Sequence, residues 1–340
     1  MKKIILLLIT AVVIMTSCTS DTTVSHEFFA MDTFIGVDAQ NTDEKVLKEL
    51  EKLVGEDEKK YSRTFSGCEL YEFNKTGNGD ALSSDTFALL KRAFEIHERT
   101  DGAFSPYLGT LTDLWDIKSE KPKVPDEADI KAVLKNCSPD GITFDGNTIV
   151  KTNKQLQLDL GGIAKGRSAG NCIEFLRSKG VKNAIISFGG SIACIGESKK
   201  GSEGWKIGIK NPFATNEIVG SINVSDIYVS VSGAYERFFE KDGKRYHHIL
   251  DPKTGYPAQT DIESVAVISE DAVISDALST ALFVMGKEKA LEFYKSNVYS
   301  FEAILMLKDG RVIVTDGIKD VFTFNGDASY KDGKKLIYDK

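Results

Sequence analysis

Hydrophobic residues recur every three or four positions in several stretches of the chain, a spacing that places them on one face of an α-helix. In residues 42–60, for example, Val46, Leu50 and Leu53 stand in a charged background. The pattern predicts five helices, which span Thr42–Lys60, Ser84–Arg99 with Ser84 as the N-cap, Asp126–Leu134, Ala164–Ser178 and a segment near Ser275–Met285.

Short runs rich in β-branched and aromatic residues predict strands at Ala184–Phe188, Trp205–Ile209, Gly220–Val224 and Tyr228–Val231. Two hairpins are also predicted, one around the turn Asp145-Gly146-Asn147 and one in which Phe301–Leu307 and Arg311–Thr315 flank Asp309-Gly310. Hairpins and helices intermingle without strict alternation, and no repeat or Pro/Ser-rich linker divides the chain. We therefore expect a single α+β (mixed α/β) domain with a largely antiparallel sheet and flanking helices.

The N-terminal segment has the pattern of an export signal. A cationic start at residues 1–3 precedes an almost wholly apolar run over residues 4–15, and small residues lead up to Cys18. The apolar run is roughly 12 residues long, whereas a membrane span needs about 20. The segment is therefore too short to remain as a transmembrane helix.

Two interpretations of Cys18 remain open. Either the signal peptide is an ordinary one, or it is a bacterial lipoprotein signal in which Cys18 becomes the lipidated first residue. Residues 14–18 resemble a lipobox, which favours the second. We therefore expect a signal peptide over residues 1–17, a lipidated Cys18 with a flexible tether over 18–26, and the functional domain over 27–340. The protein would then be anchored to a membrane of the cell envelope, outside the cytoplasm.

The composition narrows the function classes. The net charge is −7, and acidic and basic residues are interspersed. Phosphate neutralisation requires a concentrated basic patch, so we expect no nucleic-acid partner. The cysteines after Cys18 show no CxxC pair and no neighbouring histidine at metal-ligand spacing. We expect buried or partly buried thiols at Cys68, Cys137, Cys172 and Cys194.

A glycine-rich turn carries the first candidate chemistry. In Asp159–Gly166 a strand ends in an acid, two glycines open the backbone, and a helix begins near Lys165. Main-chain groups can approach a ligand there, and a helix N-terminus beside an ammonium favours an anionic phosphate. The spacing is neither the dinucleotide fingerprint nor a P-loop, so a plain strand-to-helix turn is an equal alternative.

Two adjacent histidines, His247 and His248, precede a tight loop that contains Pro252 and Gly255. Neighbouring residues on a strand face opposite sides, so one imidazole should point inward and the other outward. A histidine titrates near neutral pH, as a general base requires. A satisfied strand histidine above a surface turn is the alternative.

The third candidate lies on the helix predicted near Ser275. Asp276 and Thr280 are four residues apart and share one face of it, so a carboxylate and a hydroxyl are presented together. Hard oxygen ligands of this kind suit Mg²⁺, which also binds substrate phosphates. An aspartate N-cap with a threonine packed one turn later is the alternative.

Together these segments resemble the ApbE family of FAD:protein FMN transferases, over about Phe28 to Gly286. The matching segments occur in family order, and they are Met31-Asp32-Thr33; Ser62-Arg63 with Glu69 and Asn74; Gly102-Ala103-Phe104-Ser105-Pro106 with Leu114-Trp115; Asp159 to Gly166; Phe188-Gly189-Gly190; Ser232-Gly233-Ala234-Tyr235-Glu236-Arg237; His248 to Gly255; and Asp276 to Thr280.

The resemblance implies an exported enzyme that binds FAD with Mg²⁺, cleaves the pyrophosphate, attaches FMN through a phosphoester to a threonine or serine of an acceptor protein, and releases AMP. Such a reaction needs charge neutralisation, an aligned hydroxyl and a proton acceptor. The implied acceptor is an exported or membrane-exposed protein, typically a subunit of a membrane redox complex. The family fold places FAD in a cleft between the sheet and these loops.

The resemblance also implies roles for individual residues. Asp276 and Thr280 match the family's side-chain Mg²⁺ ligands, and the Gly162 carbonyl matches a main-chain ligand. His248 matches the histidine of the HIxDPxTG stretch and is expected to be the general base or acid, with Asp276 as the other catalytic residue and His247 facing outward. The expected FAD-contacting residues are Met31, Ala103, Phe104, Ser105, Lys165 and Leu250.

The chain departs from the family pattern at positions where Asp32 replaces glycine, Cys68 replaces serine, Ser105 replaces aspartate and Leu250 replaces isoleucine. Ser105 is the most consequential of these, because losing a carboxylate beside the flavin could change FAD affinity. No departure removes a metal ligand or the base.

Three rival functions fit parts of the sequence. Water could replace the protein hydroxyl at the same site, which would make the protein a Mg²⁺-dependent FAD pyrophosphatase giving FMN and AMP. A non-catalytic FAD-binding lipoprotein would not need Asp276, Thr280 and His248 together. A solute-binding lipoprotein of a transporter predicts two similar lobes and a hinge, and the sequence contains no sign of either.

Overall fold

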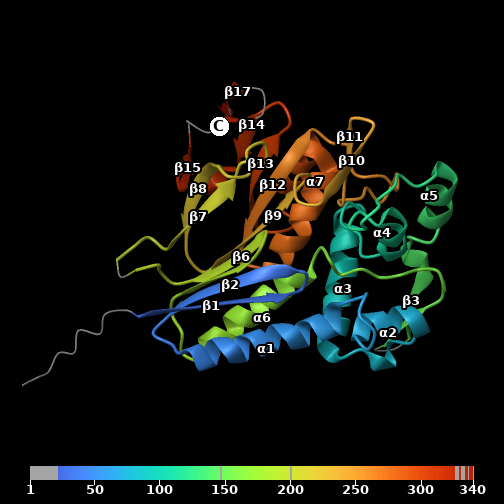
Figure 1. Cartoon of the computed structure of the whole chain (residues 1–340), viewed down its shortest axis with the longest axis horizontal. Coiled ribbons are helices and arrows are strands. Elements are labelled where there is room, and N and C mark those ends of the chain that lie inside the picture. The colour runs from blue at the N-terminus through green and yellow to red at the C-terminus, as the bar shows by residue number, and fades with distance from the viewer. Residues whose placement is uncertain are drawn as a thin grey trace, which may run out of the picture.

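The computed structural model describes residues 22–145, 148–199, 201–325, 329–330, 334–335 and 337–339. The expected mixed α/β fold is confirmed (Figure 1). The helices are α1 (Glu44–Tyr61), α2 (Glu69–Thr76), α3 (Ser84–Arg99), α4 (Gly109–Trp115), α5 (Glu127–Leu134), α6 (Ala164–Ser178) and α7 (Ala272–Lys295), with 3₁₀ turns at Gly79–Ala81, Pro139–Gly141 and Asp316–Ile318.

The main sheet has the strand order β1-β2-β5-β6-β9-β12-β13-β14-β18. All neighbouring pairs are antiparallel except β14 with β18. Its strands are β1 (Thr23–Ala30), β2 (Thr33–Gln40), β5 (Ala184–Phe188), β6 (Ser191–Ile195), β9 (Ile227–Gly233), β12 (Ile262–Ser269), β13 (Glu302–Leu307), β14 (Arg311–Val314) and β18 (Ile337–Asp339).

Smaller sheets surround the main one. Their strands are β7 (Trp205–Lys210), β8 (Ile218–Val224) and β15 (Phe322–Phe324) in one sheet, β3 (Ile142–Asp145) with β4 (Thr148–Lys151), β10 (Phe238–Lys241) with β11 (Lys244–His247), and β16 (Ser329–Tyr330) with β17 (Lys334–Lys335).

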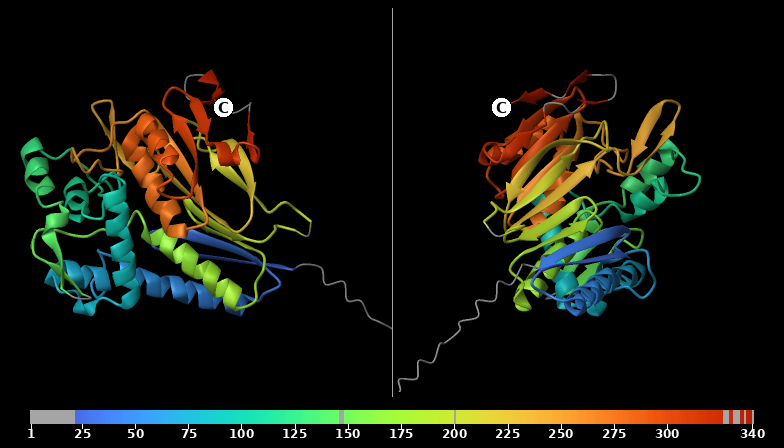
Figure 2. Two further views of the ribbon diagram at one scale, coloured as in Figure 1. Left: turned by 180° about the vertical axis from the view of Figure 1, so that it is seen from behind. Right: turned by 60° about the vertical axis from the view of Figure 1, so that its left-hand side comes forward.

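The main sheet is covered on both faces. Helices α1, α6 and α7 pack on one face, where α6 and α7 lie side by side (Figure 2, left), and the β7–β8–β15 sheet packs on the other. Successive side chains of strand β12 pack on opposite faces of the sheet. Val265 and Val267 contact the helical core, whereas Ala266 and Ile268 contact the small sheet. All residues of β12 are therefore buried.

Side chains cap the starts of α1, α3 and α7. Asp43 caps α1 by accepting a hydrogen bond from the Val46 N–H, and Asp271 caps α7 by accepting from Val273 and Ile274. The cap of α3 is Ser83, so the expectation of Ser84 was wrong by one residue. Within α7 the backbone breaks at Gly286, whose φ of 75° is one that glycine adopts without strain.

The expected tether proved too long. Residues 23–26 lie in β1, where Thr23 pairs with Gln40 of β2, so the ordered domain starts before residue 27. The expected signal peptide, Cys18 and the turn residues Gly146 and Asn147 lie outside the described residues. Within the described part of the chain, no helix is both long enough and apolar enough to cross a membrane.

The four cysteines behave as expected. All are free thiols; Cys68, Cys172 and Cys194 are buried and Cys137 is half-buried. Burial raises the pKa of Cys137 and of Cys194 to about 11, so neither carries thiolate at neutral pH.

Candidate active site

Helix α7 presents Asp276 and Thr280 toward the start of α6. Asp276 is 4% exposed, and its Oδ2 accepts a hydrogen bond of 2.9 Å from the backbone N–H of Gly166. Its other oxygen, Oδ1, lies 3.4 Å from the Ser191 hydroxyl. Thr280, one turn later on the same face, lies with its Oγ1 3.5 Å from the Ser232 hydroxyl. A fixed carboxylate and a hydroxyl therefore share one site.

Gly166 makes this arrangement possible. A side chain at this position would collide with the Ala272 carbonyl and would approach the Cβ of Asp276 to 2.7 Å. Only glycine therefore lets α6 come close enough to α7 for the Gly166 N–H to reach the Asp276 carboxylate.

The turn before α6 is held by a charged network. One carboxylate oxygen of Asp159 accepts a hydrogen bond of 2.8 Å from the Gly161 N–H. The other oxygen forms an ion pair with Arg63, whose Nε lies 2.9 Å away. Arg63 also pairs with Asp113 and is only 10% exposed. The network fixes the backbone that carries Gly162.

Gly162 faces both α7 and an aromatic ring. A Cβ built on it would lie 3.5 Å from Thr280 Oγ1 and 3.2 Å from the ring of Phe104. Lys165 completes the site: its ammonium donates to the Gly161 carbonyl at 3.3 Å and lies 3.9 Å from Asp276 Oδ1. The turn residues and the α7 residues, more than 100 positions apart in sequence, thus meet.

The donor set fits a hard divalent cation. Asp276 offers a carboxylate oxygen, Thr280 a hydroxyl, and Gly162 backbone close to that hydroxyl. Within the described segments, no group of three or more His, Cys, Asp or Glu side chains could hold a metal. A cation at this site would therefore take mixed oxygen ligands, as Mg²⁺ does when it keeps waters and substrate phosphates.

His248 lies outside β11, and its position fixes its tautomer. Its Nδ1 lies 3.3 Å from the Arg237 carbonyl oxygen, which only accepts hydrogen bonds, so Nδ1 carries the proton and Nε2 keeps its lone pair. Burial, reinforced by the positive charge of Arg237, lowers the pKa of His248 to about 3. The ring is therefore neutral at physiological pH with its lone pair on Nε2, but it does not titrate near neutral pH as the sequence led us to expect, so in this structure it is a weak base.

His247 does not face outward as expected. It is 4% exposed, packs edge-on against Phe283, and donates from Nε2 to the Ala258 carbonyl at 3.1 Å. The expectation failed because β11 ends at His247, so strand alternation does not extend to His248. His247 is thus a core residue.

We expect His247 to make the fold sensitive to acid. Burial lowers its pKa to about 4, because its Nδ1 is buried without a hydrogen-bond partner. In the unfolded chain the pKa of this histidine is near 6.5, so the unfolded chain binds the proton at a higher pH than the folded protein does. The contribution of neutral His247 to stability is therefore fully present above about pH 6.5 and is lost as the pH falls toward 4. The loss should be about 3 kcal/mol.

Urea unfolding at neutral pH and near pH 4 checks this. The wild type should lose more unfolding free energy between the two conditions than His247→Phe does, with His26→Phe, on strand β1, as the control. An equal loss in His247→Phe and the wild type would remove His247 as the cause.

The comparison with known protein families decides the identity. The model of the ApbE family matches residues 23–305. The chain belongs to the ApbE family.

Relatives and solved structures agree. A FAD:protein FMN transferase from Treponema pallidum is 36% identical over 249 residues, which are 69% of this chain and 68% of that protein. The ApbE protein from Thermotoga maritima superposes with a TM-score of 0.80 at 32% identity, covering 88% of this chain and 99% of that one. For the flavin transferase ApbE from Vibrio cholerae the TM-score is 0.77 at 27% identity, with coverages of 89% and 96%.

The structure brings together some of the residues that the sequence resemblance singled out. Phe104, Gly162, Lys165, Asp276 and Thr280 form the cluster described above.

The other residues expected to contact FAD have no direct contact with this cluster among the contacts described above. Met31 is half-buried and donates its N–H to Glu58. Ser105 accepts from the Tyr107 N–H at 3.3 Å, and its neighbour Ala103 is half-buried. Leu250 packs in a separate cluster with Trp115.

The sequence did not single out several residues of the site. Ser191 lies beside Asp276, and Ser232 bonds the Ser279 hydroxyl at 2.8 Å. Glu236 stays accessible to water, although surrounding protein raises the pKa of its carboxyl, a shift that Lys165 and Arg237 oppose. All lie in or next to the Phe188-Gly189-Gly190 and Ser232–Arg237 segments. The motifs were the available signal, but they do not say which side chain reaches the site.

Proposed function

We propose that this ApbE member is a Mg²⁺-dependent FAD:protein FMN transferase. The observation that carries the proposal is the meeting of Asp276, Thr280 and Gly162 beside the Lys165 ammonium, in a chain whose relatives bear that name. The substrates are FAD and a threonine or serine of an acceptor protein, and the second product is AMP.

The proposed roles follow from the chemistry of each group. Asp276, Thr280 and the Gly162 carbonyl would hold Mg²⁺, which when bound neutralises charge on the pyrophosphate. Lys165 attracts the phosphates, because its ammonium is positively charged and lies 3.9 Å from Asp276, at the proposed cation site. Phe104 offers a ring against Gly162, and we assign flavin contacts to Phe104, Met31, Ala103, Ser105 and Leu250.

The proton balance rests on His248. Its unprotonated Nε2 takes the proton of the acceptor hydroxyl, while the Arg237 carbonyl holds the ring by its Nδ1–H. The acceptor oxygen forms a bond to the phosphorus of the FMN half, the bond from that phosphorus to the bridging oxygen breaks, and AMP leaves with that oxygen.

Product analysis tests this proposal against hydrolysis at the same site. The purified protein is incubated with FAD, with and without Mg²⁺, and AMP and FMN are separated by chromatography. AMP that appears only with Mg²⁺, and faster with an acceptor, supports the transferase. Equal amounts of free FMN and AMP, with a rate that no acceptor changes, would instead support the pyrophosphatase. FAD that binds and stays intact would leave a non-catalytic binder.

We also propose that Cys18 is lipidated and holds the enzyme on a membrane of the cell envelope, facing away from the cytoplasm, where the acceptor is an exported or membrane redox-complex subunit. The lipobox-like residues 14–18 support this. Cys18→Ser should move the protein from the membrane fraction to the soluble exported fraction, because a cysteine thiol is needed to carry the lipid. Detergent partitioning with Cys68→Ser as the control checks it, and unchanged membrane association of Cys18→Ser would contradict it.

A further inference from the structure

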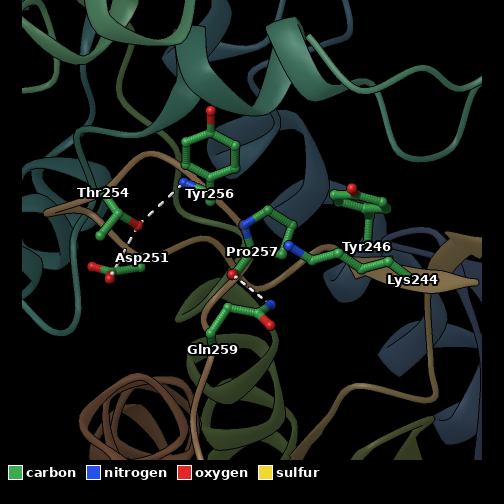
Figure 3. A pocket seen from close by; sticks show the side chains of 7 residues that line it. All are labelled: Lys244, Tyr246, Asp251, Thr254, Tyr256, Pro257 and Gln259. Carbon is green, nitrogen blue, oxygen red and sulfur yellow. Dashed lines mark hydrogen bonds between the residues drawn. The ribbon is translucent and has the colours of Figure 1, made fainter. Parts of the chain in front are cut away.

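A pocket of about 310 Å³ lies between the β10–β11 hairpin and the loop that follows His248 (Figure 3). None of its lining residues has a role in the proposed reaction. They are Lys244, Tyr246, Asp251, Thr254, Tyr256, Pro257 and Gln259.

The pocket and His248 share one loop. Asp251 follows His248 by three residues, so their Cα atoms are at most about 11 Å apart. Pro257, on the returning arm of the loop, pairs with Leu250 and brings the rest of the lining to the same place. An extended peptide advances about 3.3 Å per residue, so a residue three or four positions from a hydroxyl at His248 would reach the pocket.

The walls of the pocket are rigid and aromatic. Tyr246 stacks on Trp115 with ring centroids 5.7 Å apart, and Tyr256 meets the same indole edge-on at 5.8 Å. The indole N–H donates to the Gly255 carbonyl at 2.8 Å, which ties the loop to α4. A ligand would therefore enter a preformed site at little cost in side-chain ordering.

The lining of the pocket carries one cation, Lys244, and one acid, Asp251. The Lys244 ammonium lies 5.3 Å from the centre of the Tyr246 ring, and Figure 3 shows its side chain reaching toward Pro257. It forms no ion pair within 4.0 Å in the described part of the chain. Asp251, the only acid in the lining, is already occupied: it accepts from the Lys253 N–H at 2.8 Å and from the Thr254 hydroxyl at 3.1 Å. The free cation suits a carboxylate.

We propose that this pocket binds an acidic side chain of the acceptor protein, within about four residues of the hydroxyl that receives FMN, and that Lys244 pairs with it. The inference rests on the proposed transferase function and gives that site a determinant of acceptor specificity.

Binding of designed peptides tests the pocket without depending on catalysis. Fluorescein-labelled peptides carry one threonine in a Gly/Ala background and a single aspartate at each of the four positions on either side, with asparagine counterparts. Anisotropy with the FAD-loaded protein should show at least one aspartate peptide binding about 5-fold more tightly than its asparagine counterpart, the size expected for an accessible ion pair. No such preference at any position would overturn the proposal.

Variants locate the effect. Lys244→Glu should abolish the aspartate preference and favour the same peptide with lysine in place of aspartate, whereas Lys244→Arg should keep the preference. The matched control is Lys241→Glu, because Lys241 pairs with Lys244 across the hairpin, is also exposed, and does not line the pocket. An aspartate preference that survives in Lys244→Glu, or that Lys241→Glu removes equally, would overturn the proposal.

Two further outcomes separate this inference from its premise. Peptide binding with the aspartate preference but no FMN transfer would leave the pocket standing and overturn the transferase function. FMN transfer without the aspartate preference would leave the transferase function standing and overturn the proposal for the pocket. If Lys244→Glu weakens the binding of AMP and leaves the aspartate preference intact, the pocket belongs to the nucleotide and the proposal fails.

Discussion

Asp276→Asn should reduce Mg²⁺-dependent AMP release from FAD by at least about 100-fold, because it removes the one carboxylate of the proposed cation site. The substitution keeps the shape of the side chain and an oxygen that can accept from the Gly166 N–H, so the contact between α6 and α7 should persist. Initial rates over a range of Mg²⁺ concentrations measure the effect. The variant should also lose most of its response to added Mg²⁺.

Asp271→Asn is the matched control, because it makes the same chemical change at the N-cap of the same helix. Asparagine is as good an N-cap as aspartate, so this variant should keep its activity. Retained Mg²⁺-stimulated AMP release in Asp276→Asn would show that the cation is held elsewhere.

His248→Ala should lower FMN transfer by roughly 100-fold or more, the usual contribution of an acid–base residue, while FAD binding stays nearly unchanged. The reason is that His248 Nε2 is the unprotonated nitrogen assigned to accept the hydroxyl proton, whereas the phosphate-facing groups and all of the assigned flavin contacts except Leu250 lie on other segments. Turnover under saturating FAD, together with FAD binding followed by flavin fluorescence, separates the two effects.

Partial rescue of His248→Ala by added imidazole would distinguish a missing base from a disturbed loop. His26→Ala serves as the control, because His26 lies on β1 and bonds Glu51 of α1. If His248→Ala turns over at the wild-type rate, His248 has no part in the proton transfer.

The elements with a clear period were predictable. Helix α6 and strand β5 have the expected bounds, because their apolar residues recur with the spacing of one buried face. Helix α7 is longer than expected at both ends. Its first half is buried nearly all round and has no polar face to mark its start, and the helix continues past the break at Gly286 with Glu288, Lys289 and Glu292 exposed. Strand β12 was missed for a related reason: both of its faces are buried, so its residues do not alternate.

The candidate site was predictable in pieces but not as an assembly. The Asp159–Gly166 turn and the pair Asp276 and Thr280 were found from local spacing, but nothing local says that Gly166 and Asp276, 110 positions apart, share a hydrogen bond. Only the resemblance to a family joined them. The role of Arg63 could not be predicted from local spacing either, because Arg63 holds Asp159 through a tertiary contact between residues far apart in the sequence.

The transfer of FMN to a protein is the central claim, and the mass of an acceptor tests it most directly. The purified protein, FAD and Mg²⁺ are incubated with an acceptor protein that the Vibrio cholerae flavin transferase modifies, with that enzyme as the positive control and His248→Ala as the negative one. The account predicts that the wild type adds one FMN phosphoryl unit to a threonine or serine of the acceptor and releases an equal amount of AMP. An acceptor that the Vibrio cholerae enzyme modifies but this protein leaves unchanged, while FAD is split to free FMN and AMP, would contradict it.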